Sequence, residues 1–393
     1  MIVGIPSETF PSERRVAVVP SVIQSLITAR LEILIQAGAG EAAGFPDTAY
    51  NASGARITES RAEIFGRADV ILQVRTFGAN VEAGRADLEL LRPKQIVIGL
   101  SEPLSEPNAA RELAECGVTV CSLELMPRIT RAQSMDVLSS MATVAGYKAV
   151  LLAAETLPRM FPMLMTAAGT VTPARVLIIG AGVAGLQAIA TARRLGARVD
   201  AYDVRPAVKQ QVESLGATFI SLQLETEGAE DKSGYAKTQD DSFYQRQQEA
   251  MAKVVANANV VITTALVPGK KAPILITEAM VDGMEPGSVI VDMAAEKGGN
   301  CELTKPNQTT KHKGVTLLGP TNLPATVPYH ASQMYAKNIT TFLLHLVKEG
   351  QPEFDLNDQI TNETLVSKDG AVVHARVCEL LNQPPSGTER ISN

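Results

Sequence analysis

Short apolar runs of strand length recur through the first third of the chain. They are Ile2–Ile5, Leu31–Gln36, Val70–Val74, Gln95–Leu100 and Val118–Leu123. Segments with helical spacing, Pro20–Ala29 and Asn108–Cys116, lie between some of these runs. Alternation of strands and helices predicts an α/β region whose sheet is mainly parallel.

A second α/β pattern follows a long stretch of helical periodicity. Residues Gln133–Leu157 carry apolar side chains at helical spacing without a proline, which predicts a long helix. Six further runs have strand length: Arg175–Ile179, Arg198–Tyr202, Thr218–Leu222, Val260–Thr263, Ser288–Asp292 and Val315–Leu318. Six strands with intervening helices match the doubly wound order of a dinucleotide-binding fold.

The positions of two long helices suggest how these patterns divide into domains. A second long helix is expected over about Ala331–Lys348, so the two helices flank the second α/β pattern. We therefore expect two Rossmann-like domains, with residues 147–330 inserted into a discontinuous domain of residues 1–146 and 331–393. The cleft between the domains would be the natural place for nicotinamide chemistry.

Near the C-terminus, Thr364–His374 contains Asp369-Gly370, which predicts a hairpin with a tight turn.

One glycine-rich turn has the form of a dinucleotide-binding motif. It reads Gly180-Ala-Gly182-Val-Ala-Gly185 and lies between a predicted strand and a predicted helix. Gly180 permits the tight turn, Gly182 lets the backbone approach a pyrophosphate, and Gly185 lets the helix pack on the strand. The N–H groups at the helix N-terminus can then bind phosphate. A glycine turn without a ligand is the alternative, which the full strand–turn–helix–strand context disfavours.

Asp203, at the end of the second strand of this motif, bears on which dinucleotide binds. Its carboxylate can accept hydrogen bonds from an adenosine ribose and would repel a 2′-phosphate. The sequence therefore favours NAD(H) over NADP(H). Arg205, two residues later, weakens this argument because it carries the opposite charge.

A dense polar segment precedes the first long helix. Arg128, Gln133, Asp136 and Ser139 lie within twelve residues of one another, and together they offer the donors and acceptors that a carboxamide requires. The alternative is a capping cluster that only starts the helix.

Residues 225–241 are also polar, and their Ser233-Gly-Tyr235-Ala-Lys sequence fits either a solvated surface loop or a mobile lid that closes Tyr235 over a cofactor.

Composition excludes several classes of function. The net charge of −6 over 393 residues gives no electrostatic basis for nucleic-acid binding. The N-terminus enters a strand at once and has no signal-peptide pattern, and the longest weakly polar run, Val176–Ala192, is too short and glycine-rich for a membrane span. The four cysteines have neither zinc-like nor disulfide-framework spacing. We therefore expect no metal site, and reduced core thiols in a cytoplasmic protein.

Several segments together resemble the NAD(H)-binding component of the proton-translocating nicotinamide nucleotide transhydrogenases, within the alanine dehydrogenase/transhydrogenase family. Beside the polar segment around residues 126–140 and the glycine turn, the matching motifs are Gly4–Glu8, Arg14–Pro20, Gly234–Lys237, Thr263–Gly269, Gly298–Cys301, Thr321–Pro324 and Ser332–Asn338. The match extends from residue 1 to about residue 350. The chain is similar to the separate alpha-1 type of subunit, which ends without membrane helices.

The resemblance implies a reaction and a set of site residues. Arg128, Gln133, Asp136 and Ser139 would surround the nicotinamide, and a hydride would pass directly from NADH to NADP⁺ on a partner subunit. Because no proton leaves either ring, such a site needs no general base. The implied cofactor-binding positions are Gly180, Gly182, Val183, Gly185, Asp203, Val204, Arg205, Gly234, Tyr235, Ala236, Thr264, Ala265 and Leu266.

The resemblance also implies partners. They are a second copy of this chain, a membrane-embedded subunit that translocates protons, and an NADP(H)-binding beta-type subunit. The chain would be cytoplasmic, associated with the inner or photosynthetic membrane through these subunits and not inserted itself.

Two other functions compete with this interpretation. An alanine dehydrogenase needs an acid/base pair, for which that family uses a lysine and a histidine. This chain has no histidine before His312, and it has Gln73-Val-Arg75-Thr-Phe77 where the family has Lys-Val-Lys-Glu-Pro. Arginine cannot shuttle protons near neutral pH, although Arg15 could still bind a substrate carboxylate. A non-catalytic NAD-sensing module would keep the glycines and Asp203 but would not need the polar segment.

Overall fold

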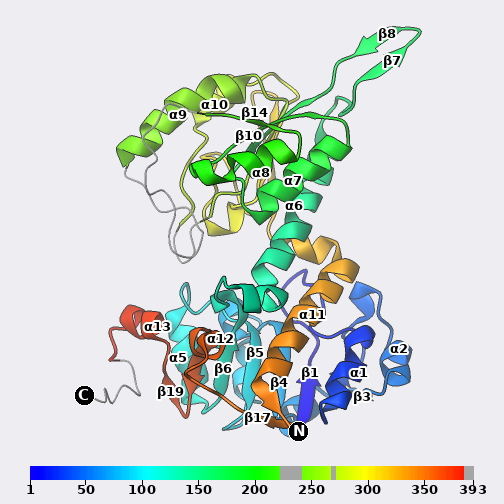
Figure 1. The fold of residues 1–393 in the computed structure, drawn as a ribbon, viewed down its shortest axis with the longest axis vertical. Coiled ribbons are helices and arrows are strands. Elements are labelled where there is room, and N and C mark those ends of the chain that lie inside the picture. The colour runs from blue at the N-terminus through cyan, green and yellow to red at the C-terminus, as the bar shows by residue number, and fades with distance from the viewer. Residues whose placement is uncertain (222–240, 267–270, 385–393) are drawn as a thin grey trace. The chain divides into compact units, whose positions relative to one another are not determined.

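The computed structural model describes residues 1–221, 241–266 and 271–384 (Figure 1). The chain forms two compact units. Unit 1 consists of Met1–Met141 together with the chain from Pro324 onward, and unit 2 consists of Ala142–Leu323. Each unit contains one large sheet.

The sheet of unit 1 has six parallel strands and an antiparallel hairpin at one edge. Its order is β19-β18-β6-β5-β4-β1-β2-β3. The strands are β1 (Ile2–Ile5), β2 (Glu32–Gln36), β3 (Arg56–Thr58), β4 (Val70–Arg75), β5 (Ile96–Leu100), β6 (Thr119–Ser122), β18 (Leu365–Lys368) and β19 (Ala371–Val372). Strand β1 pairs with both β2 and β4, so the strand order reverses there. A switch point of this kind is where open α/β sheets usually bind ligands.

Helices cover both faces of this sheet, which is why its central strands are apolar without alternation. One face packs against α3 (Arg61–Arg67), α5 (Pro107–Glu115) and α13 (Ala375–Leu380). On β4 lies α11 (Pro328–Leu346), whose Tyr335 Oη donates a hydrogen bond of 2.7 Å to the Gln73 carbonyl. The other α-helices and strands of the unit are α1 (Pro20–Thr28), α2 (Asp47–Ala52), α4 (Arg85–Leu88), α12 (Gln359–Thr364) and the small ribbon of β16 (Val347–Lys348) and β17 (Gln351–Pro352).

The predicted C-terminal hairpin is confirmed. Ser367 pairs with Val372, and Lys368 pairs with Ala371, which leaves Asp369 and Gly370 as a two-residue turn. Both turn residues have positive φ, 51° and 83°, as a type I′ turn requires. The hairpin extends the sheet because β18 pairs antiparallel with β6.

The sheet of unit 2 has the doubly wound order expected from the sequence. The order is β11-β10-β9-β12-β13-β15-β14, and only β14 is antiparallel. The strands are β9 (Arg175–Ile179), β10 (Arg198–Tyr202), β11 (Thr218–Phe219), β12 (Val260–Thr263), β13 (Val289–Asp292), β14 (Thr309–His312) and β15 (Val315–Leu318). The pattern did not predict β14 because its residues, Thr-Thr-Lys-His, carry no apolar signal.

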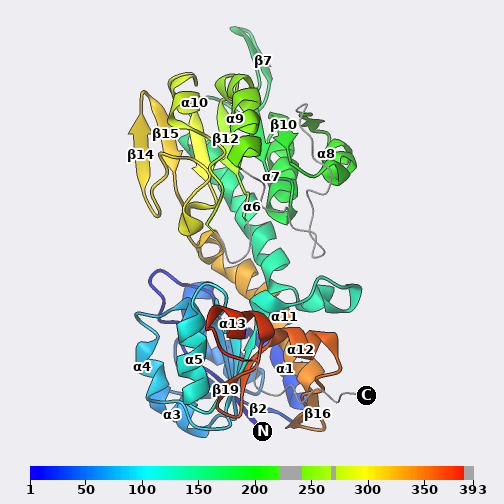
Figure 2. The ribbon, with the colours of Figure 1, turned by 90° about the vertical axis from the view of Figure 1, so that its left-hand side faces the viewer.

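Two layers of helices enclose this second sheet (Figure 2). Val176 and Ile178 of β9 pack into the core beneath α6 (Val137–Thr156), α7 (Val183–Arg194) and α8 (Lys209–Ser214). Leu177 and Ile179 face the opposite core, beneath α9 (Asp241–Ala256) and α10 (Glu278–Asp282). Both units are thus Rossmann-like, as the sequence predicts.

The long helix α6 crosses the boundary between the units. Within the described residues it is the one helix long and apolar enough to cross a membrane, with a mean hydropathy of 1.5. Ala149, Val150 and Ala153 are fully buried in the core of unit 2. Packing against that core therefore accounts for the apolar residues in this part of the helix.

One hairpin of unit 2 was not predicted. Strands β7 (Leu164–Thr166) and β8 (Gly169–Val171) form an antiparallel pair that projects from the body of the unit (Figure 1). Its side chains are mostly exposed, including Met165 at 77% and neighbouring Met163 at 57%. The alternation of a half-buried strand is therefore missing from its sequence.

Candidate functional site

The glycine turn of unit 2 has the geometry that its sequence predicts. Gly180 has φ = 98°, and a Cβ atom there would lie 2.4 Å from Thr264 Oγ1. A Cβ atom on Gly185 would lie 1.8 Å from the Gly180 carbonyl oxygen, so only glycine allows α7 to pack this closely. Gly182, in contrast, faces open space, with nothing within 4 Å of its Cβ position. A ligand can therefore approach the backbone at Gly182.

The N-terminus of α7 lies at this open position. Gly182 is the N-cap and supplies no side chain to cap the helix. Val183, the first helical residue, is 37% exposed although it is apolar. The first N–H groups of a twelve-residue helix and its dipole favour an anion at this end. A diphosphate fits this turn, because neither Gly182 nor Val183 brings a negative charge to it.

Asp203 is held in place by two sets of donors. Its Oδ2 accepts a 2.7 Å hydrogen bond from the Ala181 N–H of the glycine turn. The other donors are the backbone N–H of Arg205 at 2.8 Å, its Nε at 3.0 Å and its Nη2 at 2.9 Å. The positive charge that weakened the sequence argument is therefore ion-paired with Asp203 itself. Val204, between them, is half-buried against the core.

The segment after β12 forms a wall beside the glycine turn. Thr264 Oγ1 donates a 3.1 Å hydrogen bond to the Gly180 carbonyl, which joins the two segments. Ala265 is half-buried, and Leu266 is 41% exposed. Thr264 and Ala265 are thus close to Gly180. The predicted lid residues Gly234, Tyr235 and Ala236 lie outside the described residues.

Three of the four polar residues of unit 1, Arg128, Gln133 and Asp136, lie between β6 and α6, and Ser139 lies in the first turn of α6. Arg128 and Gln133 are exposed, and Gln133 lies in a 3-10 helix, Thr130–Met135, rather than in α6 as its periodicity suggested. Asp136 comes directly before α6 and accepts hydrogen bonds from Ser139 N at 2.9 Å and Ser139 Oγ at 2.6 Å. The Asp136 carboxylate therefore caps α6, which explains why that helix starts at Val137.

Contacts with two other helices anchor this stretch. Asn338 of α11 donates a 2.8 Å hydrogen bond to the Ser134 carbonyl, and Arg131 pairs with Asp358 at 2.7 Å. His345 also pairs with Asp358, at 2.9 Å. Burial alone would raise the pKa of Asp358, but donors from Thr361, Arg131 and His345 outweigh it and lower that pKa. The polar stretch is therefore attached to the fold at both Ser134 and Arg131.

Charged side chains of unit 1 lie at the switch point of its sheet and contact one another or the backbone. Arg15 is 3% exposed and donates two hydrogen bonds to Glu13, of 2.8 and 2.6 Å. Glu8 accepts the N–H groups of Val74 and Arg75, and burial raises its pKa to about 8. In this structure the Arg15 guanidinium is ion-paired with an internal carboxylate, and the expectation that it could bind a substrate carboxylate stays a prediction.

The position of Arg75 also argues against proton transfer at this switch point. Its guanidinium lies over the ring of Phe10, 4.1 Å from the ring centre, and its Nε is 3.6 Å from Glu13. A stacked, ion-paired arginine has a fixed charge. Arg75 thus belongs to a cluster of side chains internal to unit 1.

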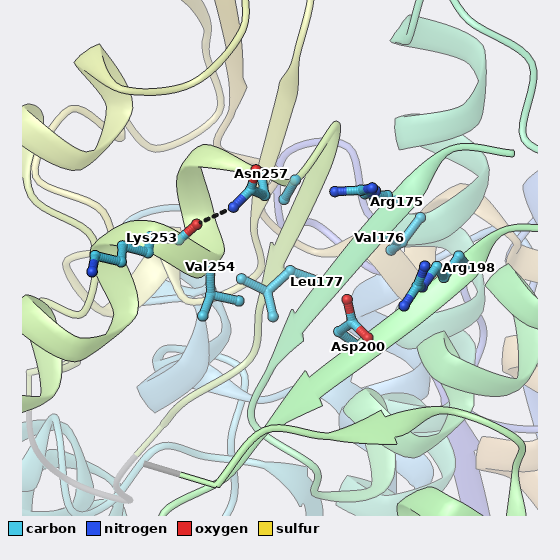
Figure 3. A pocket seen from close by; sticks show the side chains of 9 residues that line it. Arg175, Val176, Leu177, Arg198, Asp200, Lys253, Val254 and Asn257 are labelled. Carbon is cyan, nitrogen blue, oxygen red and sulfur yellow. Dashed lines mark hydrogen bonds between the residues drawn. The ribbon is translucent and has the colours of Figure 1, made fainter. Parts of the chain in front are cut away.

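A separate hollow of unit 2 lies far along the strands from the glycine turn. Arg175 and Arg198, at the start of β9 and β10, line it together with Lys253 and Asn257 near the end of α9 (Figure 3). Dinucleotides bind at the carboxyl ends of parallel strands. This hollow is at the amino ends and is therefore not the cofactor site.

Sequence reasoning gave no role to Asn300 of unit 2, although it lies within the matching motif Gly298–Cys301. It is fully buried, and its side chain bonds to both backbone groups of Ala265. The available signal was the pair Gly298-Gly299 before it, because consecutive glycines mark a backbone turn that other residues rarely adopt.

Two family models match the chain. The model described as "Alanine dehydrogenase/PNT, N-terminal domain" matches residues 4–145, and "Alanine dehydrogenase/PNT, C-terminal domain" matches residues 149–375. Together they cover most of both units.

Individual proteins are also similar over nearly the whole chain. The first part of NAD(P) transhydrogenase subunit alpha of Rhodospirillum rubrum is 45% identical, over 95% of this chain and 98% of that protein. The solved transhydrogenase of Sinorhizobium meliloti is 43% identical, with a TM-score of 0.84 over 95% of this chain and 100% of that one. A solved L-alanine dehydrogenase is 26% identical, with a TM-score of 0.81 over 97% and 99%.

Proposed function

The chain belongs to the alanine dehydrogenase/PNT family, and from this premise we propose that it is the NAD(H)-binding subunit of a proton-translocating transhydrogenase. In this proposal a hydride passes directly from NADH to NADP⁺ on a partner subunit. A membrane-embedded subunit couples the transfer to proton translocation. Its relatives are named NAD(P) transhydrogenase subunit alpha, which makes the chain an NAD(P) transhydrogenase oxidoreductase within a multi-subunit complex.

The observation that carries the proposal is the joint geometry of the glycine turn and Asp203. Gly182 leaves the backbone accessible at the start of α7, and Ala181 fixes the Asp203 carboxylate beside the same turn. A diphosphate and an adenosine ribose are the groups that such a pair recognises. The proposed NAD(H)-binding domain is residues 147–330, joined to a first domain of residues 1–146 and 331–393.

We assign the other site residues by the chemistry that each can supply. Arg128, Gln133, Asp136 and Ser139 would surround the nicotinamide and its carboxamide. Val183 would meet the pyrophosphate, and Gly234, Tyr235 and Ala236 would form the tip of a loop over the cofactor. Thr264, Ala265 and Leu266 would line the wall, with Val204 and Arg205 beside the ribose.

Hydride transfer between two nicotinamides explains why this site needs no acid or base. NADH supplies the hydride when it is bound, and no proton enters or leaves the rings. The work of the protein is then to orient one ring against the other and to exclude water. The polar stretch provides hydrogen-bonding groups, and its one carboxylate, Asp136, is engaged by Ser139.

The internal ion pairs of unit 1 support this function over that of an alanine dehydrogenase. Arg15 is paired with Glu13, and Arg75 is stacked on Phe10. Both guanidinium groups are thus engaged by side chains of unit 1 itself. We therefore do not favour pyruvate reduction, although a solved L-alanine dehydrogenase shares the fold.

Binding and turnover of the full chain test the proposal directly. We expect titration with NADH and, separately, with NADPH to show preferential binding of NADH. Hydride transfer should require an added NADP(H)-binding domain from a transhydrogenase, and pyruvate with ammonia should not be reduced. Reduction of pyruvate by the chain alone would overturn the proposal.

We further propose that the chain forms a homodimer in which the β7–β8 hairpin contacts a second copy. An isolated two-stranded hairpin is marginally stable in water, and this one exposes Met163 and Met165. A symmetric dimer can cover the same surface on both copies at once. In this arrangement the dimer is cytoplasmic and reaches the membrane only through its partner subunits.

Replacing Met165 by glutamate should therefore convert dimers to monomers, because each interface would bury a charge. Light scattering coupled to size-exclusion chromatography measures the mass. Leu356→Glu, which changes another exposed apolar residue (52%) in unit 1, is the matched control and should leave the dimer intact. A Met165→Glu protein that remains dimeric would exclude the hairpin as the interface.

A further inference from the structure

Asn300 is a fully buried side chain whose polar atoms bond to backbone groups on both sides of the segment after β12. Its Oδ1 accepts a 3.0 Å hydrogen bond from Ala265 N, and its Nδ2 donates to the carbonyl oxygens of Ala265 at 2.9 Å and Pro273 at 2.8 Å. Its own carbonyl accepts the N–H groups of Leu275 and Ile276. One residue thus holds Ala265 and the chain from Pro273 onward.

The backbone around Asn300 is itself fixed. Gly298 and Gly299 have φ of 101° and 80°, and a Cβ atom on Gly299 would lie 2.9 Å from Asp292 Oδ2. The buried carboxylate of Asp292, at the end of β13, accepts the N–H groups of Asn300 at 2.7 Å and Cys301 at 3.0 Å. The two glycines and Asp292 therefore determine where the Asn300 side chain lies.

Hydrogen bonds, together with the peptide link between Thr264 and Ala265, connect Asn300 to the glycine turn. Asn300 fixes both peptide groups of Ala265, and the preceding residue, Thr264, bonds to the Gly180 carbonyl. The glycine turn, which would bind the pyrophosphate, is thus connected to the Ala265 segment, which would contact the rest of the cofactor. A shift of the Ala265 backbone would move this segment and leave the glycine turn in place.

We propose that Asn300 is a positioning residue for hydride transfer, acting through the backbone of Ala265. The inference rests on the proposed function, because it assigns the Ala265 wall to the cofactor. Asn300 is fully buried, so it acts on the ring position and not by direct contact. Its loss should therefore reduce the rate more than it reduces NADH affinity.

Two substitutions at Asn300 separate positioning from folding. Asn300→Ala removes all three side-chain bonds, and we expect the hydride-transfer rate to fall by about tenfold or more while the NADH dissociation constant changes by less than about threefold. Asn300→Asp keeps an acceptor for Ala265 N, but it places a carboxylate oxygen against the carbonyl oxygens of Ala265 and Pro273. When the pH is lowered and this carboxylate is protonated, it regains a donor. The hydride-transfer rate of the variant, relative to that of the native chain at the same pH, should then recover.

Asn259→Ala is the matched control. Asn259 Oδ1 accepts the Arg175 N–H at the amino edge of the same sheet, so this variant also loses an asparagine-to-backbone bond but far along the strands from the glycine turn. It should transfer hydride at the native rate. Circular dichroism and the unfolding temperature establish that each variant is folded at the assay temperature.

The possible results separate the inference from the proposed function. If the native chain binds NADH and transfers hydride, but the folded Asn300 variants match it, the positioning role is wrong and the function stands. The role is also wrong if affinity and rate fall in equal proportion, or if Asn259→Ala is equally slow. If the native chain neither binds NADH nor transfers hydride with a partner domain, the proposed function itself fails.

Discussion

Replacing Gln133 by asparagine should slow hydride transfer by about a hundredfold, because a displacement of roughly 1 Å in a reacting geometry has an effect of this size. Asparagine keeps the amide but is shorter by one carbon–carbon bond, ~1.5 Å. The exposed Gln133 side chain lies in the 3-10 helix that Ser134 and Arg131 anchor to α11 and α12. Because these contacts fix the 3-10 helix, its backbone cannot move to make up for the shorter side chain.

NADH affinity should change little in the same variant. The glycine turn and Asp203 belong to unit 2, and the substitution leaves both intact. The measurement is a pair of experiments, NADH binding by fluorescence titration and single-turnover hydride transfer with an NADP(H)-binding domain. Ser134→Ala, at the neighbouring exposed position, is the control and should behave as the native chain. Equal losses of binding and rate would refute a ring-orienting role for Gln133.

Most strands of the two large sheets could be predicted because they are buried on both faces. Val176 to Ile179 pack alternately into two cores, so the strand reads as one apolar run. The same logic fails where a strand is not covered. The edge strand β14 is polar, and β7 and β8 are exposed, so none of the three leaves a hydrophobic signal.

The dinucleotide turn was predictable because each glycine has a local steric reason. Gly180 and Gly185 lie against backbone or side-chain atoms that exclude a Cβ, and such constraints belong to the motif itself. Partners within the polar clusters were not predictable. The sequence places Arg15 two residues from Glu13 and Arg205 two residues from Asp203, but spacing in a loop does not determine which charges meet.

The same limit applies to Asn300 and to the start of α6. Periodicity extended the helix back to Gln133, but the Asp136 carboxylate caps it at Val137. A capping bond is one local contact that competes with a weak helical preference. Asn300 acts between segments 35 residues apart, and the glycine pair before it indicated a turn without indicating its partner.

The pairing of Asp203 with Arg205 leads to a prediction about cofactor choice. Asp203→Ser should weaken NADH binding by about tenfold to a hundredfold, since losing a hydrogen bond to a charged group costs ~1.5–3 kcal/mol. It should also strengthen NADPH binding. Arg205 donates three hydrogen bonds to Asp203 in the native structure, and without the carboxylate its guanidinium can pair with a 2′-phosphate.

A double-mutant comparison tests whether Arg205 is the cause. Adding Arg205→Ala to Asp203→Ser should abolish the gain in NADPH affinity, while Arg205→Ala alone should leave NADPH binding weak because the carboxylate remains. Titrations with both nucleotides at one fixed ionic strength measure the four proteins on the same scale. If the double variant binds NADPH as tightly as Asp203→Ser does, the new affinity comes only from removing negative charge. The NAD(H) preference would then rest on repulsion by Asp203, with Arg205 serving to hold that carboxylate in place.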